Sequence, residues 1–269
     1  MSAGHGGRCV RWSTEAGPVF VKSAPADRDW VFEAEAEGLA ALAAASAIRV
    51  PAVLAVGTAG PSAFLVLEWL DLRSATASSE AALGTELARQ HRTAAARHGW
   101  HRDNTIGLTP QRNDPHPDWA TFYADQRLRV QLELAEANGH GGRWLERGRR
   151  LVESVPALLA GHHPMPSLLH GDLWAGNHAA DAAGRPVVFD PSVHYGDRET
   201  DLAMTRLFGG YGREFHAAYD AAWPPDPGAE ERAPLYDLYH VLNHLNLFGG
   251  GYRRQAEALI EQLLAGVAD

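Results

Sequence analysis

The chain has 269 residues, 45% hydrophobic and 21% charged, as expected for one or two folded domains with a proper core. Its net charge of −9 argues against nucleic acid as a partner and is compatible with an amine-bearing substrate. No apolar run reaches the roughly 20 residues that span a bilayer, the N-terminus lacks a signal-peptide pattern and Cys9 is the only cysteine. We therefore expect a cytoplasmic protein without membrane contact. The oligomeric state that we expect is a monomer.

The first 70 residues have the pattern of a small sheet with one helix. The pattern predicts strands near residues 8–13, 18–22, 52–57 and 63–68 and a helix over about 28–45. The character of the sequence changes near Leu70 and becomes mostly helical. We therefore expect an N-terminal domain at residues 1–70 and a C-terminal domain at residues 71–269, together forming an α+β fold.

Apolar periodicity in the second part of the chain predicts a series of helices. They cover residues 78–98, 118–138, 142–160, 199–207, 213–222, 234–247 and 253–265. Two short apolar segments, Ser167–Leu169 and Pro186–Phe189, predict strands instead. The polar segment Asp181–Arg185 between them predicts a turn.

The residues that follow these two strands give the most specific signal. His170-Gly-Asp-Leu-Trp-Ala-Gly-Asn177 follows the first strand, and Asp190 ends the second. Phosphoryl transfer from ATP uses one carboxylate that orients or deprotonates the hydroxyl, and an amide oxygen and a second carboxylate that hold Mg²⁺. Asp and Asn also make ordinary turns, but the complete spacing is hard to obtain by accident. It predicts Asp172 as the catalytic residue and Asn177 and Asp190 as magnesium ligands.

Protein kinases have His-Arg-Asp and Asp-Phe-Gly at the corresponding places. Here Gly171 replaces the Arg, and Pro191 follows the second Asp. This variant resembles the small-molecule kinases, such as aminoglycoside and choline kinases. The resemblance implies a two-lobe protein-kinase-like fold, with a small antiparallel-sheet lobe and a larger helical lobe.

Lys22 is the only lysine of the chain and ends an apolar strand-like segment. A kinase needs an ammonium there for the α- and β-phosphates of ATP, and a carboxylate from the next helix to orient it. Glu35 precedes Leu39 by four residues and so shares its inner face, with Glu33 as the second choice. The alternative for Lys22 is an exposed lysine at the end of a strand, and the alternative for the glutamates is a solvated acidic helix face. Glu68 would begin a hinge strand whose backbone groups bind adenine.

Several separate segments, between about Gly17 and Tyr252, resemble the fructosamine (ketosamine) kinases. These segments are Asp103–Gly107, Asp118–Phe122, Gln126–Leu128, His170–Asn177, Phe189–Met204 and Leu242–Gly250. The resemblance implies ATP- and Mg²⁺-dependent phosphorylation of the 3-hydroxyl of a ketosamine, on a small molecule or a glycated protein. The 3-phosphate makes the adduct unstable and releases the amine, which is deglycation.

The resemblance also implies roles for individual residues. Trp174 has a flat apolar face that suits stacking on the sugar, although it could equally brace the loop from the core. His244, Asn246 and Phe248 would lie near the sugar. His170 and Asp201 would support the catalytic loop, because buried carboxylates need hydrogen-bond partners.

The N-terminus departs from the family pattern. Gly6 and Gly7 look like the end of a glycine-rich loop that covers the phosphates, and the strand expected before that loop is absent. The same glycines could instead belong to a disordered tail. Cys9 follows in a strand, and we do not expect it to act as a redox switch.

Three other functions remain open from the sequence. The chain could be another small-molecule kinase of the same architecture, or a truncated pseudokinase that only binds nucleotide. A metal hydrolase using His170 and Asp172 is more remote, because further ligands with suitable spacing are missing. For the same reason His162-His163 is not expected to bind zinc.

Overall fold

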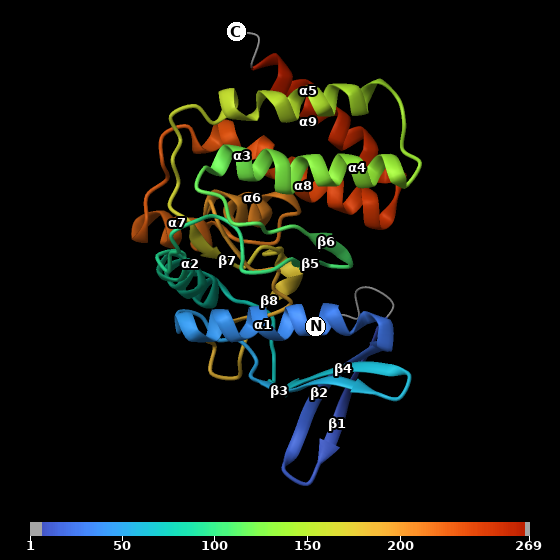
Figure 1. Ribbon diagram of the computed structural model, residues 1–269. Coiled ribbons are helices and arrows are strands. Elements are labelled where there is room, and N and C mark those ends of the chain that lie inside the picture. The colour runs from blue at the N-terminus through green and yellow to red at the C-terminus, as the bar shows by residue number, and fades with distance from the viewer. Residues whose placement is uncertain (1–6, 267–269) are drawn as a thin grey trace.

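The computed structural model describes residues 7–266 of the chain. At one end of the molecule lies an antiparallel sheet with the strand order β1-β2-β4-β3 (Figure 1). Its strands are β1 (Arg8–Thr14), β2 (Gly17–Pro25), β3 (Val53–Ala59) and β4 (Ser62–Glu68). All four were predicted from the sequence. β1 is one edge of this sheet, and β2 is paired on both sides.

Helix α1 (Asp29–Ala45) follows the short 3₁₀ turn η1 (Ala26–Arg28) and lies between the sheet and the remaining helices (Figure 1). Phe32 and Leu39 of α1 pack with Phe20 and Leu65 of the sheet in one buried cluster. Burial of such side chains stabilises the fold by about 1.5–3 kcal/mol each. This packing fixes which face of α1 turns inward.

The larger part of the molecule is helical and is built around α8 (Ala229–Phe248), which packs against α4, α6 and α9. The other helices are α2 (Ala77–His91), α3 (Trp119–Tyr123), the π-helical turn η2 (Ala124–Arg129), α4 (Val130–Ala137), α5 (Arg143–Leu158), α6 (Glu199–Leu207), α7 (Arg213–Ala222), η4 (Gly250–Tyr252) and α9 (Arg253–Ala265). Most of them match a predicted helix. Within residues 7–266 no helix is both long enough and apolar enough to cross a membrane.

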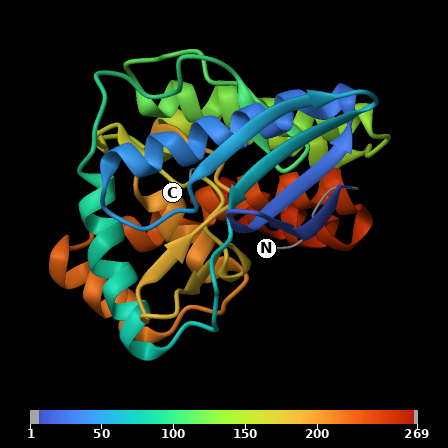
Figure 2. The same cartoon turned by 90° about the horizontal axis from the view of Figure 1, so that it is seen from below.

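Six short strands pair in twos beneath these helices. They are β5 (Asn104–Ile106) with β6 (Thr109–Gln111), β7 (Ser167–Leu169) with β10 (His194–Gly196), and β8 (His178–Ala180) with β9 (Pro186–Val188). The turn η3 (Ala175–Asn177) precedes β8. β7 and β9 were predicted as apolar segments. The other four strands were not predicted, because three-residue strands are too short to show a period of two. In the view from below, the sheet lies in front of the red C-terminal helices (Figure 2).

Two helix boundaries differ from the sequence prediction. The helix expected over residues 78–98 ends at His91, because the chain then pairs with the β7 segment: Leu168 N donates to Thr93 O at 2.8 Å, and Ala95 N donates to Pro166 O at 3.0 Å. The helix expected over residues 234–247 begins at Ala229, directly after Gly228 at φ +80°. Pro234 therefore lies inside this helix.

Candidate functional site

A cavity of about 290 Å³ opens between the sheet and the helical part. Side chains and backbone from both parts line it. The lining residues are Gly7, Arg8, Cys9, Lys22, Ala24, Arg28, Val31, Phe32, Glu35, Thr105, Gly107, Leu108, Asp172, Trp174, Asn177, Asp190, Pro191, Ser192, Asn243, His244, Leu247 and Phe248. Nine of the fourteen residues for which a site role was predicted are among them, and Gly6 lies outside the described residues.

Lys22 forms ion pairs with two carboxylates from distant parts of the chain. Its Nζ lies 2.7 Å from Oε1 of Glu35 and 2.5 Å from Oδ1 of Asp190. The side chain is buried, which alone lowers the pKa of an ammonium, but the two carboxylates outweigh burial and raise the pKa of Lys22 above its ordinary value. Lys22 is therefore charged, and it joins β2, α1 and the residue after β9.

Glu35 is the carboxylate of α1 that faces this cluster, as the helical phase predicted. Glu37 instead accepts hydrogen bonds from Trp100 Nε1 at 3.0 Å and Arg102 Nε at 2.6 Å. Glu33 lies 3.8 Å from Arg102. Glu33 and Glu37 thus face Arg102 rather than the Lys22 cluster.

Asp172, Asn177 and Asp190 come together at the floor of the cavity. The amide nitrogen of Asn177 donates to the backbone oxygen of Asp172 at 2.9 Å and to its Oδ2 at 3.3 Å. Asp190 has φ +56°, a conformation that is rare outside glycine and that often marks functional sites. Because its amide nitrogen faces Asp172, Asn177 keeps its amide oxygen for another partner.

Asp172 has an unusual electrostatic environment. Burial raises the pKa of its carboxyl to about 7, the negative charges of Asp190 and Asp201 add to the rise, and the hydrogen bond from Asn177 opposes it. Among residues 7–266, no lysine, arginine or histidine forms an ion pair with Asp172. A carboxylate with a pKa near neutrality is suited to accept a proton.

Asp201, at the start of α6, anchors the loop that carries Asp172. Its two carboxylate oxygens accept hydrogen bonds from the backbone N–H of His170 at 2.8 Å and of Gly171 at 2.9 Å. A third bond joins it to His91 Nε2 at 3.1 Å. Burial raises the pKa of Asp201, but the hydrogen bonds outweigh it and hold the pKa below its ordinary value. Asp201 is thus an ionised anchor.

His170 and Gly171 complete this support. His170 Nε2 bonds the Phe189 carbonyl at 3.1 Å, and the Asp172 backbone N–H donates to its Nδ1 at 3.3 Å. Burial lowers the pKa of His170, so the ring is neutral. Gly171 has φ +83°, and a Cβ there would lie 2.0 Å from the Ser192 carbonyl oxygen. The glycine in place of a kinase arginine is therefore a packing requirement.

Trp174 is 39% exposed and lines the cavity, which excludes the alternative of a core tryptophan. Its ring lies over Gly176, where a Cβ would come within 2.1 Å of the indole. The glycine therefore allows the indole to pack closely against the turn η3. The exposed part of the side chain remains available to a ligand.

The end of α8 forms another wall of the cavity, but not with all the predicted residues. Asn243, His244, Leu247 and Phe248 line the cavity because positions three and four apart share a helix face. Asn246 points elsewhere, and its Nδ2 donates to Gln131 Oε1 at 2.8 Å. The expectation for His244 agrees with the geometry, whereas Asn243 rather than Asn246 faces the cavity.

Glu68, expected at the nucleotide, also lies outside the cavity lining. Its carboxylate accepts from Arg49 at 2.7 Å and from the Ala52 N–H at 3.2 Å, and its own N–H donates to Ala52 O at 2.8 Å. Within the described part of the chain, no backbone hydrogen bond occupies the N–H of Trp69 or Leu70. These two residues are the ones that follow the sheet.

A buried polar network beside the cavity was not predicted. Arg127 is 1% exposed and has no carboxylate partner within residues 7–266. Its guanidinium donates to Asn113 Oδ1 at 2.8 Å, Asn113 donates to Asn104 at 2.8 Å, and Asn104 donates to the Val193 carbonyl at 2.6 Å. Gln111 joins the network through Asn104 at 2.9 Å. The network connects the β5–β6 turn, which lines the cavity, to the segment after Asp190.

Partial signals for these unpredicted residues are present in the sequence. Arg127 and Asn104 lie in segments quoted for the family resemblance, but their contacts join residues far apart in the chain. His91 is a polar residue on the buried face of α2, next to Leu87 and Ala88. Such a position is more often a satisfied core histidine than a site residue, and here it orients Asp201.

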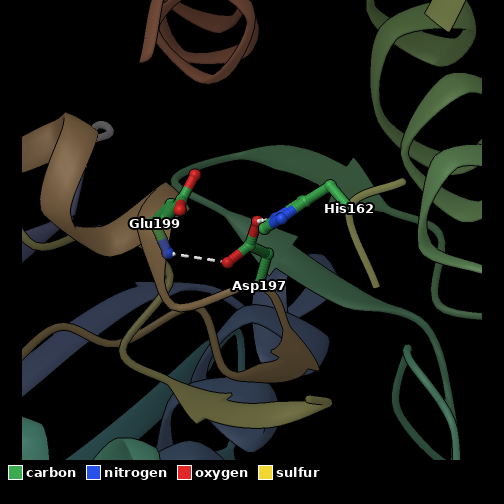
Figure 3. A group of neighbouring side chains, drawn as sticks. All are labelled: His162, Asp197 and Glu199. Carbon is green, nitrogen blue, oxygen red and sulfur yellow. Dashed lines mark hydrogen bonds and ion pairs between the residues drawn. The ribbon is translucent and has the colours of Figure 1, made fainter. Parts of the chain in front are cut away.

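A second group of titratable side chains, His162, Asp197 and Glu199, contains no residue that lines the cavity. Figure 3 shows how the three side chains lie. His162 Nε2 lies 2.6 Å from Asp197 Oδ2, and Tyr236 donates to the same oxygen at 2.6 Å. Both oxygens of Glu199 accept from Arg232, at 2.6 and 2.7 Å. A metal ion bound here would have to displace the Arg232 guanidinium from Glu199. The group is a satisfied network that joins the loop before β7 to the start of α6.

Comparison with known proteins places this site in context. A family model described as fructosamine kinase matches residues 1–266. A Synechocystis protein named probable ketoamine kinase is 45% identical over 246 residues, which cover 91% of this chain and 82% of that protein. The chloroplastic protein-ribulosamine 3-kinase of Oryza sativa subsp. indica is 40% identical over 266 residues, covering 96% of this chain and 77% of that protein.

Solved structures agree with this assignment. A Haemophilus somnus 129PT protein described as a candidate fructosamine-3-kinase superposes with a TM-score of 0.91 at 30% identity, covering 98% of this chain and 90% of that one. An aminoglycoside phosphotransferase solved with ADP and hygromycin B has a TM-score of 0.64 at 13% identity. The latter likeness shows the fold alone, which is the two-lobe, protein-kinase-like α+β fold predicted from the sequence.

Proposed function

Because the chain belongs to the fructosamine kinase family, we propose that it transfers the γ-phosphoryl group of ATP to the 3-hydroxyl of a ketosamine. The observation that carries the proposal is the meeting of Lys22, Asp172, Asn177 and Asp190 in one cavity. The names of the relatives, ketoamine kinase and protein-ribulosamine 3-kinase, support the acceptor class. Phosphorylation at this position destabilises the adduct, and loss of the sugar phosphate releases the amine.

We assign Asp172 as the residue that receives the hydroxyl proton. The hydroxyl oxygen forms a bond to the γ-phosphorus, the bond from that phosphorus to the β-phosphate oxygen breaks, and ADP leaves. The pKa of about 7 supports this role, because the carboxylate is ionised above neutrality and still basic enough to accept a proton. Asp201, His170 and Gly171 act through the loop geometry and are positioning residues.

The nucleotide and its metal are assigned to the sheet side of the cavity. Asn177 and Asp190 supply hard oxygen ligands, which suit Mg²⁺. Lys22 bonds one carboxylate oxygen of Asp190, so the other oxygen and the Asn177 amide oxygen remain for the ion. When bound, Mg²⁺ neutralises charge that develops on the phosphates. Lys22, oriented by Glu35, contributes a compact positive charge for the α- and β-phosphates.

The rest of the nucleotide would extend toward the end of β4. The backbone of Trp69 and Leu70 is suited to bind the adenine edge, with Glu68 acting only through Arg49 and Ala52. Gly7 lines the cavity and Gly6 precedes it in the chain, which supports their assignment to a loop over the phosphates. In this proposal residues 1–70 bind the nucleotide and residues 71–269 carry the catalytic and acceptor-binding groups.

The sugar is assigned to the opposite wall. The exposed indole face of Trp174 supports stacking on the sugar ring, and His244 can accept a hydrogen bond through Nε2, because its Nδ1 donates to the His240 carbonyl at 2.8 Å. Burial lowers the pKa of His244, so the ring is neutral.

A cytoplasmic location and a monomeric state stay predictions of the sequence.

The proposal is tested by ATP consumption of the purified chain with Mg²⁺ and a small fructosamine or ribulosamine. We expect turnover that requires the ketosamine and that is lost in Asp172→Asn. Aminoglycosides serve as the competing acceptors. Turnover of aminoglycosides without turnover of any ketosamine would contradict the acceptor class. Nucleotide binding without turnover of either would contradict catalysis and favour a binding protein.

A further inference from the structure

Aromatic side chains gather where the cavity meets the surface, at the end of α8. Phe208, His244, Phe248 and Tyr252 form this group, which we call the aromatic rim. Ring centroids of His244 lie 4.6 Å from Phe208, 5.4 Å from Phe248 and 5.2 Å from Tyr252. Phe248 is 63% exposed and Phe208 38%. Exposed large apolar side chains that cluster mark binding surfaces more often than those that occur singly.

The aromatic rim is continuous with the catalytic cavity. His244 and Phe248 line the same cavity as Asp172. The loop after Phe208 also touches the catalytic loop, since a Cβ on Gly210 would lie 2.4 Å from Cβ of Ala175. A molecule whose hydroxyl reaches Asp172 can therefore extend along one uninterrupted wall to the rim.

The electrostatics of the rim favour a cation. The last turn of α8 carries no basic residue, and a helix C-terminus has a partial negative charge. The faces of the aromatic rings are also negative and attract ammonium groups. His244 is neutral and adds no repulsion. The two guanidinium groups that line the cavity, Arg8 and Arg28, come from β1 and η1 on the sheet side.

We propose that the aromatic rim is a subsite for the protonated secondary amine of the ketosamine and for the apolar chain attached to that nitrogen. The inference rests on the proposed function and adds which amines are preferred. With the 3-hydroxyl at Asp172, the nitrogen on carbon 1 lies only two carbons further along the sugar. An apolar chain on the nitrogen then covers Phe248, whereas an acidic chain meets the negative end of α8.

The test compares kcat/KM for fructosamines whose nitrogen carries methyl, pentyl or 4-carboxybutyl. Burying part of the longer apolar chain predicts a pentyl-to-methyl ratio of about ten. The carboxybutyl compound is expected to be about tenfold poorer than the pentyl compound at low salt. Phe248→Ala should bring the pentyl-to-methyl ratio close to one, whereas Phe248→Tyr, which keeps the ring, should preserve it. Trp12→Ala is the matched control, because Trp12 is 62% exposed on β1 and outside the cavity lining.

A ratio near one in the unmodified protein, or a ratio unchanged by Phe248→Ala, would overturn the subsite. A ratio that falls equally in Trp12→Ala would overturn its location. Calorimetric binding of the three compounds separates this inference from the proposed function. If no fructosamine is turned over but the pentyl compound still binds about tenfold more tightly than the methyl compound, the proposed function fails and the subsite stands. Absence of any binding would overturn both.

Discussion

Asp172→Asn is expected to stop catalysis and to stabilise the protein above neutral pH. The substitution removes a negative charge but keeps the shape and the oxygen that accepts from Asn177 at 3.3 Å. Burial, together with repulsion from Asp190 and Asp201, raises the pKa of this carboxyl from 3.8 to about 7. The folded protein therefore holds the proton more tightly than the unfolded chain does, and ionisation of Asp172 favours unfolding.

The magnitude follows from the linkage between protonation and folding. A difference of roughly three pKa units at 1.36 kcal/mol per unit corresponds to a ceiling of about 4 kcal/mol. Asp172 is only half-buried, so water screens part of this and we expect about 2 kcal/mol. Below pH 4 the carboxyl is protonated in both states and the cost is absent. The cost grows as the pH rises from about 4 to 7, and it is constant above 7.

The assay is calorimetric unfolding of both proteins from pH 4 to 9, without nucleotide or Mg²⁺, since either would change the charge at the site. The melting temperatures should coincide near pH 4 and separate by roughly 4–8 °C at pH 8, with Asp172→Asn the more stable. Turnover should fall by about 10²–10⁴, and ADP binding should be retained. Equal stability at pH 8, or a lower melting temperature for the variant, would refute the assigned electrostatics. Near-normal turnover would refute the catalytic role.

Three further outcomes are expected. The acid limb of kcat/KM should rise with pH and level off above about 7, because only ionised Asp172 accepts the proton; a flat profile between pH 5 and 9 would contradict this. Gly171→Ala should lower the free energy of unfolding by about 3 kcal/mol or more, since its Cβ would meet the Ser192 carbonyl at 2.0 Å. The control Gly139→Ala, at φ +84° with no atom within 4 Å, should lower it by only about 1 kcal/mol. Equal losses in the two variants would show that the contact with Ser192 is unimportant. Arg127→Met should raise KM for the ketosamine several-fold, because the network that Arg127 joins holds the β5–β6 turn, which lines the cavity; an unchanged KM with a lower melting temperature would mean that the network serves folding alone.

The site residues that the sequence brought together correctly are those that lie close to one another in the chain or share a helix face. Asp172, Asn177 and Asp190 lie on one loop and the end of the next strand, so hairpin geometry almost determines their meeting. Glu35 was selected by helical phase, and its pairing with Lys22 at 2.7 Å agrees with that reasoning. The strands of the sheet were also visible, because they are seven to nine residues long.

The parts that the sequence could not predict depend on contacts between distant segments. Asn243 and Asn246 are equally polar and close in the chain, and Gln131 forms hydrogen bonds with both, so only the orientation of α8 in the folded protein decides which one lines the cavity. The end of α2 at His91 follows from pairing with the β7 segment 75 residues later, measured from Thr93 to Leu168. Arg127 carries no local sign that it reaches Asn113 in the interior.

The three aspartates of the site show how one motif gives each carboxylate a different task. Asp190 has the Lys22 ammonium as its ion-pair partner at 2.5 Å. Asp201 has two backbone N–H groups and His91, which keep it ionised although it is buried. Within residues 7–266 the Asp172 carboxylate accepts a hydrogen bond only from the Asn177 amide, and the other two negative charges act on it. Burial contributes most to the raised pKa of Asp172, and the negative charges of Asp190 and Asp201 add to it. The arrangement thus concentrates proton affinity at the residue that faces the acceptor hydroxyl, at the cost of stability that Asp172→Asn should recover.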